Sequence, residues 1–200
     1  MRHPVLKIST PRVVIFAGPN GAGKSTHADD ILAGLDIPIF VNADYIARGL
    51  SGRNTDAVAF EAGRIMLKRL RQLAAAREDF AFESTLSSRT FAPFLARLKT
   101  DGYQVSIYYF ALGNAQLAVR RVKLRVSLGG HAVPTDVVRR RFGRSLKNFM
   151  TLYAPLASLW AVFDNSSLAD ARLVAAHSDN QLTVKEPTLW RKLQKLAISL

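Results

Sequence analysis

Residues 18–26 form a glycine-rich stretch, GPNGAGKST, whose residue types and spacing suit the binding of phosphate groups. A phosphate-binding loop has a glycine, four further residues and then Gly-Lys-Ser/Thr, and these positions are filled by Gly18, Gly23, Lys24 and Ser25. Glycines permit a tight turn whose backbone N–H groups converge on phosphate oxygens, and the following helix adds the positive end of its dipole. The stretch therefore predicts a site for the phosphates of a nucleotide.

The side chains that follow the last glycine have distinct expected roles. Lys24 would reach the β- and γ-phosphates. Ser25 is the expected magnesium ligand, because Mg²⁺ keeps most of its waters and accepts only one or two protein oxygens beside the phosphates. The chain lacks an Asn-Lys-x-Asp element for reading guanine, which favours ATP. The predicted ATP-binding residues are Gly18, Pro19, Asn20, Gly21, Ala22, Gly23, Lys24, Ser25 and Thr26.

An acidic residue, Asp44, follows the apolar run 37–41 in the sequence FVNADYIARGL. Open α/β sheets bind ligands at the carboxyl ends of their strands, and a carboxylate there can take the proton of an acceptor hydroxyl during phosphoryl transfer. Asn42 and Asp44 are therefore candidates for substrate binding, with Asp44 as general base. The alternative is that both residues only cap the next helix and complement its dipole.

A second acidic residue, Glu83, ends the apolar run in DFAFEST, two positions before Thr85. We expect Glu83 to orient the substrate or to support the magnesium ion, with Thr85 beside it. Asp164, in WAVFDNSS, is the rival for this role. We prefer Glu83 because ligand sites gather where neighbouring strand ends converge beside the loop.

Apolar β-branched runs alternate along the chain with stretches of helical periodicity. The expected strands are 12–17, 37–41, 80–82, 103–112, 159–163 and 171–177, and helices are expected over 56–77, over 114–128 and from 134 onward. The second of these helices would bury Leu117, Leu124 and Leu128. Near-continuous hydrophobic strands are typical of a sheet that helices cover on both faces. We predict an α/β fold with a doubly wound parallel sheet, like that of P-loop NTPases and nucleotide kinases.

The segment from Arg120 to Lys147 concentrates positive charge, with nine Lys or Arg residues and a single acid, Asp136. It is open to two interpretations. The cations could belong to a helical lid, at about 114–150, that closes over the triphosphate, where arginines stabilise the charge of a transferring phosphoryl group. They could instead form a basic surface that binds nucleic acid.

The overall composition limits the classes of protein that fit. A chain of 200 residues with 48% hydrophobic residues is expected to form one globular domain over 1–200. The absence of cysteine excludes a disulfide scaffold, and the net charge of +13 predicts attraction to phosphates. No apolar run reaches the roughly 18 residues of a membrane span, so we expect a cytoplasmic protein without a membrane partner.

Together, GPNGAGKST, FVNADYIARGL, FESTLSS and the arginine-rich segment ending in HAVPTDVVRRRF resemble the zeta toxin family of P-loop kinases. The resemblance implies a kinase that uses ATP and magnesium to phosphorylate a sugar-nucleotide hydroxyl, in toxin members the 3′-OH of UDP-N-acetylglucosamine. By position, it implies that Asp44 deprotonates the acceptor and that Glu83 and Thr85 contact it. It also implies a small helical antitoxin as a protein partner of toxin members.

Lids of this family carry two arginines on the phosphates. The resemblance places the first at Arg121, although Arg120 and Arg125 compete in register. The second position falls on His131, and a histidine that is mostly neutral at pH 7 is a weaker phosphate clamp. Arg140 or Arg141 would replace it, and we take Arg141 as the candidate.

The leading hypothesis is an ATP-dependent kinase of a small-molecule hydroxyl, possessing the catalytic residues Lys24, Asp44, Arg121 and Arg141. The alternative is a nucleic-acid-binding P-loop ATPase or a polynucleotide kinase. Aromatic residues do not interleave with the arginine cluster as stacking platforms would, which favours the small-molecule kinase.

Overall fold

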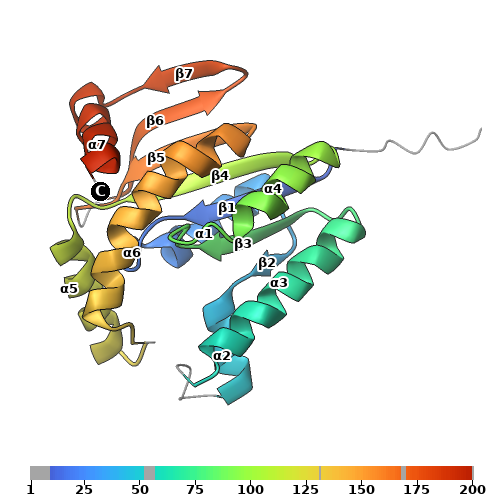
Figure 1. Ribbon diagram of the computed structural model, residues 1–200, viewed down its shortest axis with the longest axis horizontal. Coiled ribbons are helices and arrows are strands. Elements are labelled where there is room, and N and C mark those ends of the chain that lie inside the picture. Colours follow the sequence, from blue (N-terminus) through green and yellow to red (C-terminus); the bar gives the residue numbers. More distant parts are fainter. Residues whose placement is uncertain (1–9, 52–56, 131, 168–169, 200) are drawn as a thin grey trace, which may run out of the picture.

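The computed structural model describes residues 10–51, 57–130, 132–167 and 170–199. Its centre is a seven-stranded sheet in the order β2-β3-β1-β4-β5-β6-β7, and Figure 1 shows helices packed along it. The strands from β2 to β5 in this order pair in parallel. The strands are β1 Arg12–Ala17, β2 Phe40–Val41, β3 Phe80–Ser84, β4 Gln104–Ala111, β5 Leu159–Asp164, β6 Arg172–Ser178 and β7 Gln181–Val184.

One edge of the sheet departs from the predicted all-parallel arrangement. β6 pairs antiparallel with β5, and β7 pairs antiparallel with β6. Asp179 and Asn180, both with positive φ, join β6 to β7 in a two-residue turn that suits a right-twisted hairpin. The expectation of a parallel sheet is therefore correct for the strands beside the phosphate-binding loop and wrong for this edge, because the hairpin turn contains no glycine to signal it.

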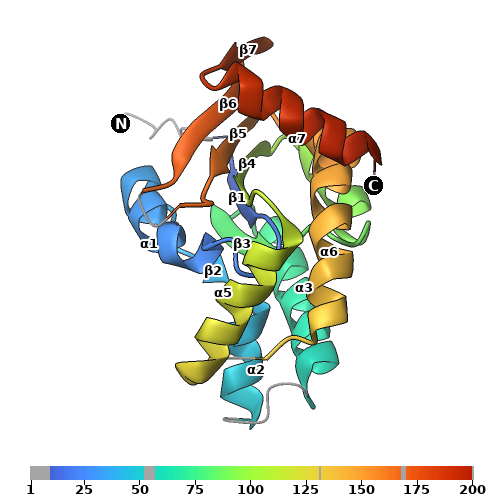
Figure 2. The ribbon, with the colours of Figure 1, turned by 90° about the vertical axis from the view of Figure 1, so that its left-hand side faces the viewer.

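Helices cover both faces of the sheet, as a doubly wound fold requires. One apolar cluster joins α1 and α5 to one face, and a second joins α3, α4 and α7 to the other. Figure 2 shows α1 and α3 on opposite sides of the strands. The helices are α1 Lys24–Leu35, α2 Ala43–Ser51, α3 Ala59–Ala75, α4 Phe91–Thr100, α5 Ala115–Ser127, α6 Thr135–Asn148 and α7 Pro187–Ser199, and α6 continues into a π-helical turn, Phe149–Tyr153, and a 3-10 turn, Ala154–Leu156.

The two helices of the predicted lid, α5 and α6, bury different amounts of their length. α6 buries Val138, Phe142 and Leu146 as its periodicity predicts. α5 buries Ala118, Val119 and Val122, whereas Leu124 and Leu128 are exposed. The predicted leucine stripe is thus right for Leu117, which packs partly buried against the apolar cluster, and wrong for Leu124 and Leu128 at the exposed end of the helix. Within the described ranges, no helix is long and apolar enough to cross a bilayer.

Candidate nucleotide and phosphoryl-transfer site

The glycine-rich loop leaves β1 and packs closely against the ends of neighbouring strands. Gly18 has a φ of 137°, and a Cβ there would lie 2.3 Å from the backbone oxygen of Phe110 in β4. Gly23 has a φ of 81°, and a Cβ there would lie 2.4 Å from Nδ2 of Asn165. Both the backbone conformation and the available space therefore require glycine. The loop path depends on these two close approaches.

Asn165, which directly follows β5, holds the loop from the side. Its Nδ2 donates a hydrogen bond of 2.9 Å to the carbonyl oxygen of Ala22, and only 8% of the residue is exposed. Asn165 was not among the predicted site residues, whereas its neighbour Asp164 was the predicted rival of Glu83. Asp164 accepts a hydrogen bond from Ser166 and pairs with Arg172 at 3.4 Å. Asn165 could have been found from the sequence, because it is a polar residue that directly follows an apolar strand.

Glu83 connects the loop to the strand beside it. β3 pairs with β1 so that Glu83 lies opposite Phe16, directly before the loop begins. One carboxylate oxygen of Glu83 lies 3.4 Å from Lys24 Nζ. The other accepts hydrogen bonds from Ser25 Oγ at 2.5 Å and from Asn42 Nδ2 at 3.1 Å. The register of two parallel strands thus brings together residues from three separate segments.

Lys24 begins α1 and is 6% exposed, which is unusual for a lysine. Its ammonium group also donates to the carbonyl oxygen of Pro19 at 3.1 Å. A buried charge is tolerable only when it is paired and hydrogen-bonded, and Glu83 and Pro19 provide both. The ammonium is therefore held inside the loop, in the position from which a P-loop lysine reaches phosphates. Ser25 and Thr26, directly after it, are exposed.

Asn42 and Asp44 stand at the junction of β2 and α2. Asn42 Oδ1 accepts a hydrogen bond of 2.8 Å from the backbone N–H of Asp44, while its Nδ2 reaches Glu83. Asn42 is thus both the cap of α2 and part of the loop network. Asp44 lies half-buried in the first turn of α2, where the helix dipole favours a carboxylate.

Arg141, on α6, is partly buried and lies close enough to Asp44 for their charges to interact. Partial burial lowers the pKa of the Arg141 guanidinium, the charge of Arg140 lowers it further, and the carboxylate of Asp44 opposes both effects. Arg140 itself is exposed and lies 3.8 Å from Asp136 on its own helix. Of the two neighbours, Arg141 is the partly buried one whose charge interacts with Asp44, whereas Arg140 is exposed. His131, the alternative position for a second lid residue, lies outside the described residues.

Buried hydrogen bonds anchor α6 to the segment that follows Glu83. Ser145 Oγ, one turn after Arg141, donates to the carbonyl oxygen of Thr85 at 2.5 Å and lies 2.9 Å from the hydroxyl of Tyr109. Burial strongly raises the pKa of Tyr109, so its phenol stays neutral. Asn148 donates to the carbonyl oxygen of Leu86 at 2.9 Å. The position of α6 is consequently tied to the backbone beside Thr85.

Arg121 projects from α5 beside the loop, but its guanidinium is already engaged. It donates to the carbonyl oxygens of Asn165 at 2.6 Å and Ser167 at 2.8 Å. A Cβ at Gly21 would come within 3.2 Å of the Arg121 Cβ, so Arg121 borders the glycine-rich turn. Of its competitors, Arg120 is exposed, and Arg125 packs against Gly130. Arg121 therefore links the loop to the segment after β5.

The oxygen atoms around Ser25 fit a magnesium ion. Mg²⁺ prefers hard oxygen ligands, and Ser25 Oγ is exposed and hydrogen-bonded to the carboxylate of Glu83. Because Ser25 is exposed, its hydroxyl oxygen can also be reached from solvent by an ion. Ser25 is thus suited to direct coordination and Glu83 to support it from behind.

Solved structures share this arrangement of strands, loop and helices. A chain of the AvrRxo1-ORF1:ORF2 complex with ATP matches with a TM-score of 0.75 at 15% identity, covering 92% of this chain and 63% of that one. The PezAT toxin–antitoxin system of Streptococcus pneumoniae gives 0.62 at 14% identity, covering 96% and 86%. A gluconokinase from Sinorhizobium meliloti gives 0.51 at 13%, covering 95% and 93%. The fold and its loop define a P-loop kinase architecture.

The sequence itself assigns the family. The zeta toxin family profile matches residues 2–169, and the chain therefore belongs to the zeta toxin family. An uncharacterized protein of Haemophilus influenzae is 27% identical over 134 residues, which are 66% of this chain and 92% of that protein. This chain spans less than two thirds of the matching AvrRxo1 chain. The resemblance read from the motifs is confirmed.

Proposed function

We propose that this protein is an ATP-dependent kinase that transfers the γ-phosphate to a hydroxyl group of a small molecule. The observation that carries this proposal is the network around Glu83, which joins Lys24 and Ser25 of the loop to Asn42 at the start of α2. A passive nucleotide site needs the loop alone. Asn42 also caps the helix that carries the proposed base, Asp44, and Asp44 interacts with the charge of the proposed catalytic arginine, Arg141.

Each residue of the site has its own role in the proposed phosphoryl transfer. Loop N–H groups and Lys24 hold the β- and γ-phosphates, and Asp44 accepts the proton of the acceptor hydroxyl. The acceptor oxygen bonds to the γ-phosphorus as the bond from that phosphorus to the β–γ bridging oxygen breaks, which leaves ADP. Arg141 stabilises the negative charge that spreads over the transferring group. Magnesium, when bound, neutralises part of the phosphate charge, with Ser25 as its protein ligand.

Phosphorylation of a panel of acceptors tests the proposal directly. The protein is incubated with labelled ATP, magnesium and hydroxyl compounds that include UDP-N-acetylglucosamine, the acceptor that the family resemblance implies. Mass spectrometry should show the gain of one phosphate on a panel member. Hydrolysis of ATP without transfer to any member would contradict the proposed reaction.

Asp44→Asn separates catalysis from nucleotide binding. The amide keeps the size of the side chain and cannot take a proton, so kcat should fall by about 10²–10⁴-fold. The affinity for ATP, measured by calorimetry, should stay unchanged. Asp30→Asn, an exposed substitution on α1, is the matched control and should retain activity. Full activity of Asp44→Asn would remove the proposed base and leave Asp44 as a helix-capping residue.

A protein antitoxin is a proposed partner, because the PezAT system is described as a toxin–antitoxin system. Growth of cells that express this chain, with and without the adjacent gene of its operon, tests this. Restored growth and a stable complex during purification are the expected results.

Nucleic acid is the second candidate partner, because α5 and α6 expose many cations. The exposed basic residues are Arg120, Lys123, Arg139, Arg140, Arg144 and Lys147. Binding through the phosphate backbone would weaken steeply as salt rises. A gel-shift titration of RNA and DNA against salt that shows no such affinity would dismiss this candidate.

A further inference from the structure

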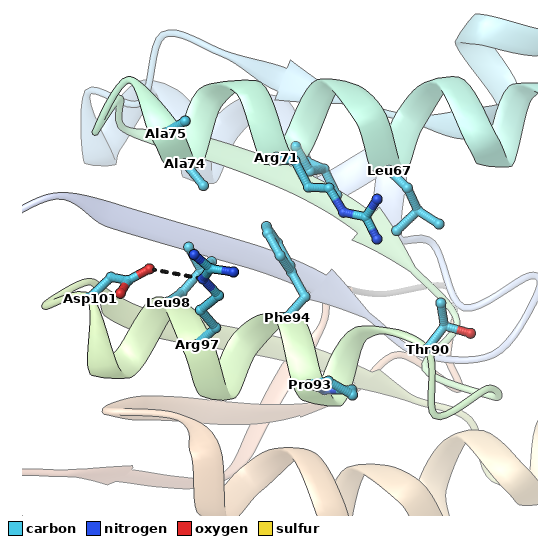
Figure 3. A pocket seen from close by; sticks show the side chains of 11 residues that line it. Leu67, Arg71, Ala74, Ala75, Thr90, Pro93, Phe94, Arg97, Leu98 and Asp101 are labelled. Atoms are coloured by element: carbon cyan, nitrogen blue, oxygen red, sulfur yellow. Dashed lines mark ion pairs between the residues drawn. The ribbon is translucent and has the colours of Figure 1, made fainter.

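We propose that the groove between α3 and α4 is a docking site for another protein that presents an acidic amphipathic helix. The groove has a volume of about 570 Å³. Leu70 and Leu98 are buried within it, and Figure 3 shows Leu67 and Phe94 pointing into the space between the two helices. The groove therefore offers apolar surface from Leu67 and Phe94, with the buried leucines forming its floor.

The apolar surface continues along α3 beyond the groove. A neighbouring hollow shares Leu67 and Arg71 with it and adds Phe60 and Ile65. Phe60 is 82% exposed, although a phenylalanine side chain is among the most costly to leave in water. A contiguous apolar surface with a polar border is typical of a site where another molecule binds.

Charged residues at the border of this surface indicate which charge the partner protein should carry. Arg64, Lys68 and Arg71 rise from α3, and Arg97 rises from α4. Two carboxylates accompany them, of which Asp101 is ion-paired with Arg97 at 3.6 Å. Acidic side chains on the partner would meet the remaining cations, whereas a basic partner would be repelled.

The dimensions of the groove suit a helix. α4 has ten residues and so extends about 15 Å, which corresponds to roughly three turns of a partner helix. Such a helix would place apolar residues at i, i+3 or i+4, and i+7 between α3 and α4. α1, which begins with the loop lysine, packs against the opposite face of the sheet. Docking would therefore leave the nucleotide site uncovered, and the proposal does not depend on the kinase activity.

A pair of synthetic peptides tests the proposal on the full chain. Each 18-residue peptide carries leucines at helical spacing, and the other positions are glutamate in one peptide and lysine in the other. Fluorescence anisotropy should show binding of the glutamate peptide that is at least about tenfold tighter than that of the lysine peptide. Amide NMR shifts caused by the glutamate peptide should concentrate on α3 and α4.

Substitutions then locate the site. Arg71→Glu should weaken binding of the glutamate peptide by about tenfold, because it reverses a charge at the groove border. Leu67→Ser is a second variant that removes apolar contact without changing charge, and it should weaken binding too. Lys192→Glu, on the exposed side of α7, makes the same charge change elsewhere and should have no effect. Phosphate transfer by Arg71→Glu should keep its kcat and KM. A failure of the docking proposal can therefore be distinguished from a failure of the proposed kinase function.

Three results would overturn the docking proposal. The first is equal binding, or no binding, of the two peptides. The second is peptide-induced shifts that fall on α5 and α6 instead of the groove. The third is self-association in sedimentation that Arg71→Glu abolishes, which would assign the groove to a second copy of this chain.

Discussion

The phosphate-binding loop and the helices α5 and α6 border the same region, yet different interactions hold them. The loop is held through its backbone: Gly18 lies against Phe110, and the carbonyl oxygen of Ala22 accepts from Asn165. The two helices contribute long side chains. Of these, Arg121 is bound to carbonyl oxygens after β5, while Arg141 is partly buried and its charge interacts with that of Asp44.

This difference shows why a motif predicts one region and not the other. A site that is formed by backbone groups needs glycine at particular positions, because a Cβ there would clash with neighbouring atoms. A side-chain-built site depends on which of several arginines the tertiary contacts direct inward. Single substitutions that each remove one interaction can therefore test this contrast.

The largest effect is expected at the loop, from Lys24→Ala. Because the ammonium group is the buried cation of the site, its loss should reduce kcat/KM by at least about 10³-fold. Steady-state kinetics measure the loss, and circular dichroism shows that the variant folds. Lys99→Ala, an exposed substitution on α4, is the control. Retained activity in Lys24→Ala would show that the loop does not act on the transferred phosphate.

Arg141→Ala tests the helices in the same way. If Arg141 stabilises the transferring group, kcat should fall by about 10²–10³-fold while ATP still binds. Arg140→Ala, one residue earlier on the exposed side of α6, should change kcat little. The reverse outcome would assign the role to Arg140 and would show that α6 rotates when nucleotide binds.

Ser145→Ala tests the anchor that holds α6. The substitution leaves the buried hydroxyl of Tyr109 and the carbonyl oxygen of Thr85 without their partner, which should cost about 1–3 kcal/mol of unfolding free energy. Urea denaturation measures this loss. Ser127→Ala, an exposed position on α5, should be nearly neutral. An unchanged midpoint for Ser145→Ala would mean that α6 is not fixed through this residue.

The smallest effect is expected from Asn165→Ala. It removes one neutral hydrogen bond to the loop, worth about 1 kcal/mol, and should weaken ATP binding by severalfold. Calorimetry with ATP measures the change, and Asn165→Asp should weaken binding further, because it sets a buried carboxylate against the Ala22 carbonyl oxygen. Unaltered affinity in both variants would show that the glycines alone maintain the loop.

Much of the fold could be predicted from local pattern. The strand 12–17 was predicted with its observed bounds, and α5 lies within the helix predicted over 114–128. The β6–β7 hairpin was missed because its Asp179-Asn180 turn lacks glycine. The stripe predicted for α5 was right for Leu117 and wrong for Leu124 and Leu128, because helical periodicity does not show how much of a helix the neighbouring elements cover.

The amino-acid sequence alone determined the phosphate-binding loop, the parallel strands beside it and the family of the protein. These features rest on short-range requirements, such as glycine at positive φ and apolar runs long enough to be buried. Only the tertiary structure decided that Glu83 meets Lys24 and Ser25, that Asn165 supports the loop and that the charges of Arg141 and Asp44 interact. Those contacts join segments distant in the chain, and they depend on strand register and helix packing, which no local pattern encodes.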